Sequence, residues 1–365
     1  MNSTQFSLEQ QTHSKTIGDS RGALLVRSAL VWDECISWTS MDLVGADKSI
    51  KLGALPGYRA AGVNVASLTI GGDYGTEFQR SRGWLASERR FINESLSESC
   101  LLIQHIDDIE RARRQNKLAV SFHFQGATPF LNYESEAPGN IDLVSLYYDL
   151  GVRRALLAHN HRNAIADGCK EPDNAGLSIF GKRIVREMAR VGMVLDCTHM
   201  GERSSLESME LFGKPCVFSH SNAKQVFAHP RNISDQLIKM CAATGGVIGL
   251  TGWGPIVNER NESSPEAIAN HVYYVADLVG CQHVGIGLDY VYVPELTTKR
   301  VKENAELYAP LGSLEQYNYH HEVQRFAPPS TFAPLADLLL QKMSEQEVRG
   351  ILGENWLRVA QMNWR

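Results

Sequence analysis

The sequence predicts an α/β protein folded as one (β/α)₈ TIM barrel, and three observations support that prediction. The chain has 365 residues, and a complete barrel of this kind needs about 250 residues. Short apolar runs rich in β-branched residues alternate with segments of helical spacing along most of the chain. No G-x-G-x-x-G motif follows an early apolar run, which argues against a dinucleotide-binding sheet.

Eight apolar runs are the expected strands. They are apolar on both faces, as is typical of parallel strands that are covered by helices. We predict these strands at residues 29–37, 62–70, 117–126, 152–160, 193–199, 216–222, 245–253 and 283–290.

The segments between the strands carry the spacing of amphipathic helices. We predict helices within residues 106–116, 141–151, 177–192, 202–213, 234–245 and 265–280. The segment 177–192 places Ile179, Ile184, Val185, Met188 and Val191 on one side. Ser234 and Asp235 give a cap signal at the start of their helix.

The remaining segments set the expected domain organisation. Residues 1–24 read as a polar extension, and residues 25–365 as a single barrel domain with helices at its C-terminal end. The stretch 294–334 reads as a long irregular loop, the kind that often serves as a lid or partner contact. The tail 336–364 reads as two helices joined near Gly353.

Composition and charge narrow the classes of function. Lys plus Arg number 36 and Asp plus Glu number 41, for a net charge of −5, which gives no electrostatic case for binding nucleic acid or an anionic membrane. The amino end is polar and no run of about 18 apolar residues occurs, so we expect neither a signal peptide nor a membrane span. The seven cysteines are dispersed without C-x-x-C spacing, which favours a reducing, cytoplasmic location.

Polar side chains recur where the expected strands end. In a barrel, chemistry gathers at the carboxyl ends of the strands because eight loops converge there. The residues at these positions are Cys35, Ser37, His123, Gln125, His159, His161, His199, His220 and Asp289. His199 and His220 end consecutive strands, so their neutral imidazoles can converge on one cation such as Zn²⁺. A hydrogen-bonded histidine at each strand end is the plainer interpretation; the pairing favours the metal.

Several motifs, in order, give a more specific likeness. They are LLAHNHRN around His159, LDCTHM around His199, VFSHSNA around His220, HPRN around Arg231, VGIGLDY around Asp289 and GENWLRV near the end. The chain resembles the renal (membrane) dipeptidase family, peptidase M19, over roughly residues 25–365. The resemblance implies a barrel of the metallo-dependent hydrolase type, a dipeptide or other small substrate, and a homodimer.

The resemblance also implies roles for single residues. Family members hold two zinc ions: a His-x-Asp pair ends strand one, histidines end strands five and six, and a glutamate ending strand three bridges the ions. Carried over, His199 and His220 become ligands of one metal, and Asp289 the carboxylate that moves a proton. Arg231 becomes the clamp for the substrate carboxylate, which suits its planar fork. His159 becomes the residue that orients the substrate carbonyl.

The sequence departs from the family at three ligand positions. Where the family has D-G-H-x-D, residues 33–37 read D-E-C-I-S, so Cys35 and Ser37 occupy degenerate ligand positions; Gln125 replaces the bridging glutamate. The site loses two formal negative charges, which makes a second divalent ion hard to hold. We therefore expect one Zn²⁺ per chain, bound by His199 and His220 and completed by Asp289, Gln125 or water.

The roles of three neighbouring residues stay open at this point. Cys35 is either a thiolate ligand or an inert buried thiol. His123, two residues before Gln125 and on the same side of a strand, is either a substitute ligand or a barrel-core histidine. His161 is either a donor behind the site or a histidine of a surface loop.

Three functions compete. The first is a metal-dependent hydrolase that cleaves a dipeptide or small carboxylate-bearing amide through a metal-activated water. The second is a non-hydrolytic metabolic enzyme, such as a lyase or isomerase, on the same scaffold. The third is an inactive homologue that binds a carboxylate through Arg231 and His159. The fold alone does not separate them.

Overall fold

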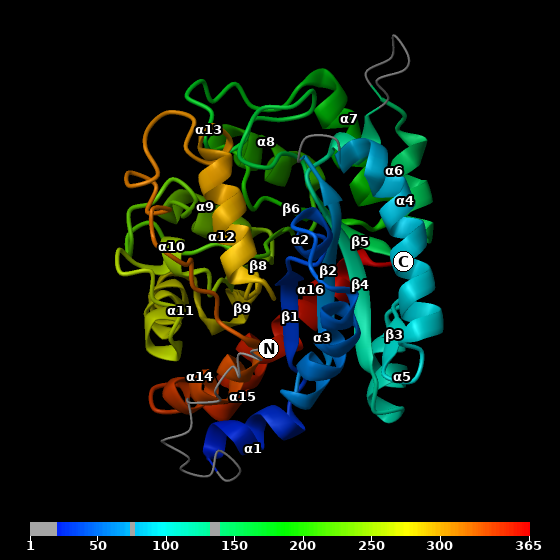
Figure 1. Ribbon diagram of the computed structural model, residues 1–365, viewed down its shortest axis with the longest axis vertical. Coiled ribbons are helices and arrows are strands. Elements are labelled where there is room, and N and C mark those ends of the chain that lie inside the picture. The colour runs from blue at the N-terminus through cyan, green and yellow to red at the C-terminus, as the bar shows by residue number, and fades with distance from the viewer. Residues whose placement is uncertain (1–19, 74–76, 132–138) are drawn as a thin grey trace, which may run out of the picture.

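Eight parallel strands form a nearly closed barrel in the computed structural model, which describes residues 20–73, 77–131 and 139–365. Neighbours follow chain order (Figure 1). The strands are β1 (Trp32–Ile36), β2 (Val65–Gly72), β4 (Leu118–Gln125), β5 (Val152–Leu156), β6 (Val194–Asp196), β7 (Val217–Phe218), β8 (Val247–Leu250) and β9 (Val284–Ile286). Each overlaps a predicted strand, so the predicted (β/α)₈ barrel is confirmed. The sequence did not predict β3 (Cys100–Leu102), which pairs with β4 off the main path.

The junction of β1 and β9 closes the barrel and positions the site. Ile36 and Tyr290 form a parallel bridge. The backbone N–H of Asp289 donates to the carbonyl of Cys35 over 2.9 Å, and that of Ser37 donates to the carbonyl of Tyr290 over 3.2 Å. These bonds bring Cys35 beside Asp289, although 254 positions separate the two residues in the sequence.

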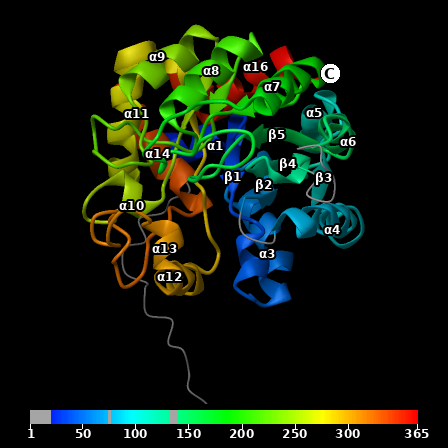
Figure 2. The ribbon, with the colours of Figure 1, turned by 90° about the horizontal axis from the view of Figure 1, so that it is seen from above.

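Helices surround the barrel (Figures 1 and 2). They are α3 (Lys48–Ala60), α4 (Glu77–Arg90), α5 (Asp107–Arg114), α6 (Asp142–Asp149), α7 (Ile179–Val191), α8 (Glu202–Phe212), α9 (Asp235–Ala243) and α11 (Pro265–Val279). Ser234 accepts from Leu237 N and begins α9 as its cap signal predicts. Among the described residues, no helix is long and apolar enough to cross a membrane.

Helix α7 corrects one detail of the predicted buried face. Phe180, Ile184, Val185, Met188 and Val191 are buried, whereas Ile179 is 86% exposed. Ile179 comes five positions before Ile184, so it lies on another side of the helix, and Phe180, at the four-residue spacing, takes the buried place.

The barrel interior changes from apolar to polar along the strands. An apolar cluster near the strand starts contains Trp32, Val65, Ala119, Val194, Val217, Val247 and, from α16 (Asn355–Asn363), Trp356. Two residues further along β1 and β6 lie Glu34 and Asp196. Both carboxylates bind Arg154 of β5, which is 1% exposed; its Nε lies 2.9 Å from Glu34 Oε1. This buried ion triad separates the apolar end from the carboxyl ends of the strands.

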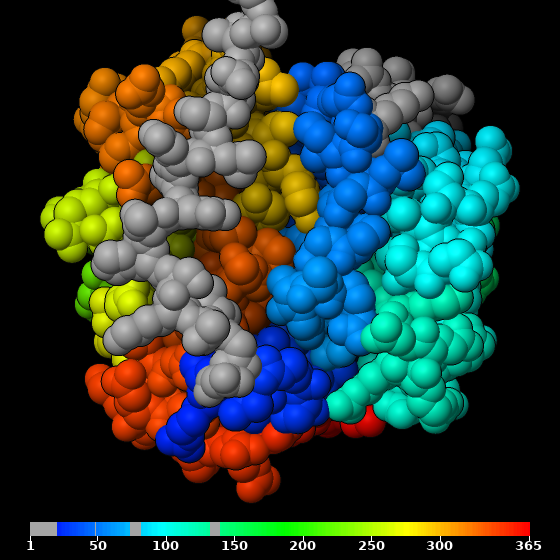
Figure 3. All heavy atoms as spheres, turned by 60° about the horizontal axis from the view of Figure 1, so that its bottom comes forward, coloured from blue at the N-terminus to red at the C-terminus, as the bar shows by residue number. Residues whose placement is uncertain are grey.

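Different helices cover the two ends of the barrel. The stretch 294–334, expected to be irregular, contains α12 (Pro294–Glu303) and α13 (Ala305–Tyr308), so that expectation was wrong in part. Pro294 at the first position of α12 starts a helix well because its fixed φ is already helical. At the opposite end, α1 (Arg21–Ser28) packs on α14 (Phe332–Leu339) (Figure 3). Gly22 N donates to Asp337 Oδ1 over 2.6 Å. Helix α1 begins inside the predicted polar extension 1–24.

The C-terminal tail also differs from the prediction of two helices joined near Gly353. After α14, α15 (Glu345–Arg349) continues through a π-helical turn, Gly350–Glu354, directly into α16. Gly353 lies inside that turn, where a Cβ would come within 2.4 Å of Leu30 O. This glycine therefore permits close packing on the barrel and does not break the helix.

Candidate metal centre and active site

A cavity of about 100 Å³ opens at the carboxyl ends of the strands. Its polar lining from the barrel includes Thr69, Gln125, His159, His199 and Asp289, and its rim comes from α2 (Ser40–Leu43), α12 and aromatic residues such as Trp253 and Tyr319. The small volume favours a short substrate over a folded polypeptide. The predicted convergence of strand-end residues is therefore observed for His159, His199, Gln125 and Asp289.

Two histidines face each other at this end of the barrel, and one of them, His199, lines the cavity. His199 follows β6 and His220 follows β7, and their Nε2 atoms lie 3.0 Å apart. Both side chains are buried. Burial, with the nearby Arg231 charge as the next cause, lowers the pKa of both imidazoles well below the usual value. Both rings are therefore neutral near pH 7, the form that binds a metal.

A protein oxygen holds the other nitrogen of each ring. Asn160 Oδ1 lies 2.8 Å from His199 Nδ1, and Ser219 Oγ lies 2.7 Å from His220 Nδ1. When both Nδ1 atoms donate, both Nε2 lone pairs face the same point. Asn160 and His199 have φ values of +60° and +67°, left-handed conformations that turn their side chains toward the site.

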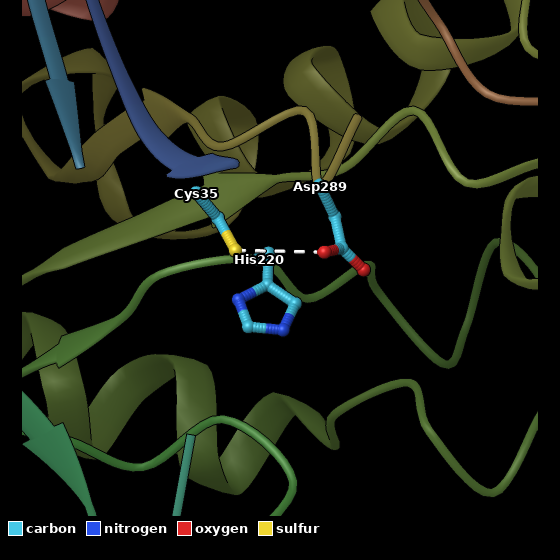
Figure 4. Close-up of side chains that lie close together, drawn as sticks. All are labelled: Cys35, His220 and Asp289. Atoms are coloured by element: carbon cyan, nitrogen blue, oxygen red, sulfur yellow. Dashed lines mark hydrogen bonds between the residues drawn. The ribbon is translucent and has the colours of Figure 1, made fainter. Parts of the chain in front are cut away.

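A second group of ligand atoms adjoins the histidine pair. One ligand atom each of Cys35, His220 and Asp289 lies within 4.8 Å of the others. Cys35 Sγ lies 3.5 Å from Asp289 Oδ1, and the two side chains point toward one another beside the His220 ring (Figure 4). The β1–β2 register shifts between Asp33 and Ile36, which lets both Glu34 and Cys35 reach interior groups.

Gln125 lies beside Cys35, but its amide nitrogen makes the contacts. Gln125 Nε2 donates to Cys35 Sγ over 3.3 Å and to Thr69 Oγ1 over 3.0 Å. Because an amide nitrogen carrying hydrogens does not bind a metal, this arrangement does not favour Gln125 as a ligand. Below it, His123 has Nδ1 2.9 Å from Ser67 Oγ and Nε2 2.8 Å from Thr69 Oγ1, as expected of a barrel-core histidine.

Arg231 and His159 adjoin the histidine pair. The Arg231 guanidinium is buried and donates from Nη2 to the His220 carbonyl over 3.1 Å. Its Nε has no hydrogen-bond partner among the described residues. The ring of His159 stacks on that of His199 with centroids 3.7 Å apart. Burial lowers the pKa of His159 well below the usual value.

Asp289 is the carboxylate of the site. Burial raises its pKa to about 6, while the positive charge of Arg231 opposes that shift. A carboxyl group with a pKa near neutrality can both take up and return a proton under physiological conditions. The backbone of Asp289, with a φ of +54°, is in the left-handed region, so the chain leaves the extended path of β9 at this residue.

The structure also places the two remaining predicted residues and shows others that the sequence did not indicate. Ser37 lines the cavity. His161 Nε2 lies 2.8 Å from the backbone carbonyl of Leu307 in α13. The sequence did not indicate Asn160 or Ser219. Nor did it indicate Asp73, whose Oδ2 accepts from His159 N over 3.0 Å and from Asn163 Nδ2 over 2.7 Å. Asn160 and Ser219 are next to predicted histidines in the sequence, and this position was the only feature of the sequence that pointed to them.

Comparison with known proteins then gives the family. The sequence profile of the membrane dipeptidase family, peptidase family M19, matches residues 88–322. This chain belongs to the membrane dipeptidase family. The match includes His159, His199, His220, Arg231 and Asp289, and it confirms the resemblance expected from the motifs.

Curated relatives are similar over part of their length. An uncharacterized dipeptidase of Schizosaccharomyces pombe is 35% identical over 156 residues, 42% of this chain and 38% of the relative. The dipeptidase tcpJ of Claviceps purpurea is 29% identical over 271 residues, 73% of this chain and 56% of the relative. This chain therefore spans about half the length of the curated relatives that it matches.

Solved structures share the fold over nearly the whole chain. An amidohydrolase of Pseudomonas aeruginosa superposes with a TM-score of 0.75 at 26% identity, covering 94% of this chain and 99% of that one. A metallo peptidase of Rhodobacter sphaeroides, liganded with a phosphinate mimic of the dipeptide L-Ala-D-Ala, has a TM-score of 0.72. It is 17% identical and covers 92% of this chain and 99% of that one, a likeness of fold.

Proposed function

We propose that this protein is a metal-dependent hydrolase that cleaves a dipeptide or a similarly small amide bearing a carboxylate, with one divalent ion per chain. The observation that carries the proposal is the 3.0 Å approach of the Nε2 atoms of His199 and His220, with each Nδ1 held by a protein oxygen. Two nitrogens that bind one tetrahedral zinc at about 2.0–2.1 Å lie a little over 3 Å apart, so little rearrangement is needed.

The donor set fits a borderline transition ion. His199 and His220 supply imidazole nitrogens, and Asp289 supplies a carboxylate within 4.8 Å of a His220 nitrogen. Such sets suit Zn²⁺ better than Mg²⁺ or Ca²⁺, which prefer oxygen alone. A divalent ion here would polarise the substrate carbonyl and make water nucleophilic near neutral pH.

The surrounding side chains have distinct roles in this proposal. Arg231 holds the substrate carboxylate through its planar fork, since its Nε lacks a partner and its charge is buried. His159, packed on His199 and anchored through its backbone to Asp73, orients the carbonyl. Asp289 takes the proton from water and returns it to the leaving amine.

The finer properties of the protein are part of the same proposal. Zinc is the ion we expect, the protein acts as a homodimer, and it works in the cytoplasm. The dispersed cysteines support the last point, because all seven are free and five are buried. A dipeptide is the first substrate class to test, because the Rhodobacter relative in fold binds a dipeptide mimic.

A dipeptide-hydrolysis screen with zinc-loaded protein tests the proposal. We expect release of free amino acids from at least one dipeptide, and a loss of at least about 100-fold in rate for His199→Ala because a zinc ligand is removed. The exposed His105 provides the matched control, His105→Ala, which should keep the full rate. A metal-loaded protein that cleaves no dipeptide or small amide would favour the lyase or isomerase alternative, and a protein that binds a carboxylate without metal would favour the inactive homologue.

A further inference from the structure

The Cys35 sulfur is surrounded by side chains of an unusual kind for a buried thiol. Its neighbours are Asp289 Oδ1 at 3.5 Å, Gln125 Nε2 at 3.3 Å and His123 Nε2 at 3.8 Å. The sulfur, a His220 nitrogen and the Asp289 carboxylate form a compact group of three ligand atoms from β1 and from the segments that follow β7 and β9 (Figure 4). A carboxylate, an imidazole and a sulfur atom are all donors that zinc accepts.

Other buried cysteines do not share this environment. Cys241, which is also fully buried, has its sulfur 3.4 Å from Cys216 O and 3.8 Å from Val247 O, both backbone carbonyls. Those contacts are what a thiol filling apolar space makes. Cys35 instead lies in a group with a His220 nitrogen and the Asp289 carboxylate, so packing alone does not account for its position.

The charges in the site give a second argument. Two neutral imidazoles and one carboxylate leave a dication with one uncompensated positive charge, and Cys35, His220 and His199 are all nearly inaccessible to water. An unbalanced buried charge is costly. A thiolate at Cys35 cancels the remaining charge, and the N–H of Gln125 that points at the sulfur stabilises the anionic form.

The neighbouring His123 does not compete for this role. Both of its ring nitrogens are hydrogen-bonded, one to Ser67 and the other to Thr69. The Gln125 amide nitrogen donates hydrogen bonds to the Cys35 sulfur and to Thr69 Oγ1. The sulfur is therefore the soft metal ligand at this edge of the site.

We propose that Cys35 is a thiolate ligand of the single divalent ion held by His199 and His220, with the Asp289 carboxylate close to both the sulfur and a His220 nitrogen. The inference rests on the proposed function for the existence of the ion, and adds which donor replaces the missing strand-one pair. The Cys35 S–H bond breaks as the sulfur–metal bond forms, and the proton leaves to solvent. A soft thiolate makes the site select Zn²⁺, Co²⁺ or Cd²⁺ over Mn²⁺ and Mg²⁺.

Cobalt substitution of the full-length protein tests the proposal without measuring activity. Co²⁺ bound to a thiolate gives an intense sulfur-to-cobalt charge-transfer band in the near ultraviolet, which nitrogen and oxygen ligands do not give. We expect the band in the wild-type protein and in Cys241→Ser, and its loss in Cys35→Ser and Cys35→Ala. Both Cys35 variants should still bind cobalt, at least about 10-fold more weakly, because one ligand is gone. Circular dichroism checks that each variant is folded.

The outcomes separate this inference from the proposed function. Cobalt bound by the wild-type protein without a charge-transfer band, or a band that persists in a folded Cys35→Ser, would overturn the thiolate ligand and leave the histidine metal site standing. A wild-type protein that binds no cobalt, zinc or cadmium would overturn both. A Cd²⁺-to-Mn²⁺ affinity ratio that falls at least about 10-fold in Cys35→Ser supports the proposal, and an unchanged ratio contradicts it.

Discussion

At the scale of single residues, the site combines the paired imidazoles of His199 and His220 with the uncharged Cys35 and Gln125 side chains. The sequence could predict that His199, His220 and Asp289 meet, because the carboxyl ends of parallel barrel strands converge. It could not predict that the Gln125 amide nitrogen, and not its oxygen, faces Cys35. Nor could it predict the left-handed backbone of Asn160, because both depend on packing between segments that lie far apart in the chain.

Restoring the bridging carboxylate alone should not create a second metal site. In Gln125→Glu the N–H that donates to Cys35 and Thr69 is lost, and the strand-one positions still hold a cysteine and a serine. We expect metal analysis to find about one zinc per chain in this variant. The triple variant with Cys35→His and Ser37→Asp should approach two. Two tightly bound ions in the single variant would show that the glutamine alone limits the metal count.

Arg231 should act on substrate binding more than on the chemical step. Lysine keeps the charge but loses the planar fork, so we expect Arg231→Lys to raise KM for a dipeptide at least about 10-fold with a much smaller change in kcat. Steady-state kinetics measure both constants, and Arg183→Lys on the exposed side of α7 is the matched control. An unchanged KM would remove Arg231 from the carboxylate-binding role.

At the scale of elements, the periodic segments were predictable and the irregular ones were not. The strands and most helices follow from apolar runs and helical spacing, as α9 illustrates with its Ser234 cap. Helix α12 was not predicted within residues 294–334, and only its Thr298 and Val301 are buried. Such a short apolar face gives a weak periodic signal. Ile179 shows the same limit, because an apolar residue at a helix start need not be buried.

The buried ion triad of β1, β5 and β6 should be costly to break on one side only. Arg154→Met leaves the carboxylates of Glu34 and Asp196 buried without their cation. We expect it to lower the free energy of unfolding by about 3–5 kcal/mol. Denaturant unfolding measures this, and the added changes Glu34→Gln and Asp196→Asn should recover much of the loss. Equal stability of Arg154→Met and the wild-type protein would contradict the proposed role of the triad.

His271 in helix α11 makes two hydrogen bonds that depend on pH. His271 Nδ1 accepts from Ala223 N at 3.2 Å, and Nε2 donates to Val257 O at 2.8 Å, so the ring must be neutral. Burial lowers its pKa from 6.5 to about 4. The pKa of His271 is lower in the folded protein than in the unfolded chain. Its contribution to the free energy of unfolding is therefore complete above pH 6.5 and is lost as the pH falls toward 4. The loss is on the order of 3 kcal/mol.

Unfolding as a function of pH checks this assignment. The free energy of unfolding should fall between pH 6.5 and pH 4 in the wild-type protein. His271→Gln should be less stable at pH 7 but show a flatter slope in that range. The same substitution at the exposed His105 should leave the slope unchanged. A slope that is equally steep in His271→Gln would assign the acid sensitivity to other groups.

At the scale of the whole molecule, closure of the barrel and assembly of the site are one event. The backbone bonds that join β1 to the end of β9 also place the Cys35 sulfur 3.5 Å from the Asp289 carboxylate. Ligands that come from opposite ends of the chain are brought together only in the folded barrel. An ion that binds them therefore stabilises the folded state over the unfolded one. We expect the thermal midpoint of the protein to rise when zinc is added and to fall again with a chelator.

The number of zinc ions in each chain tests the central claim most directly. Native mass spectrometry of zinc-loaded protein, after removal of loosely bound metal, counts them in the intact molecule. We predict one zinc per chain in the wild-type protein and none in His199→Ala or His220→Ala, because the two Nε2 atoms 3.0 Å apart form the core of the site. Two zinc ions per chain, or one that remains after both histidines are replaced, would contradict it.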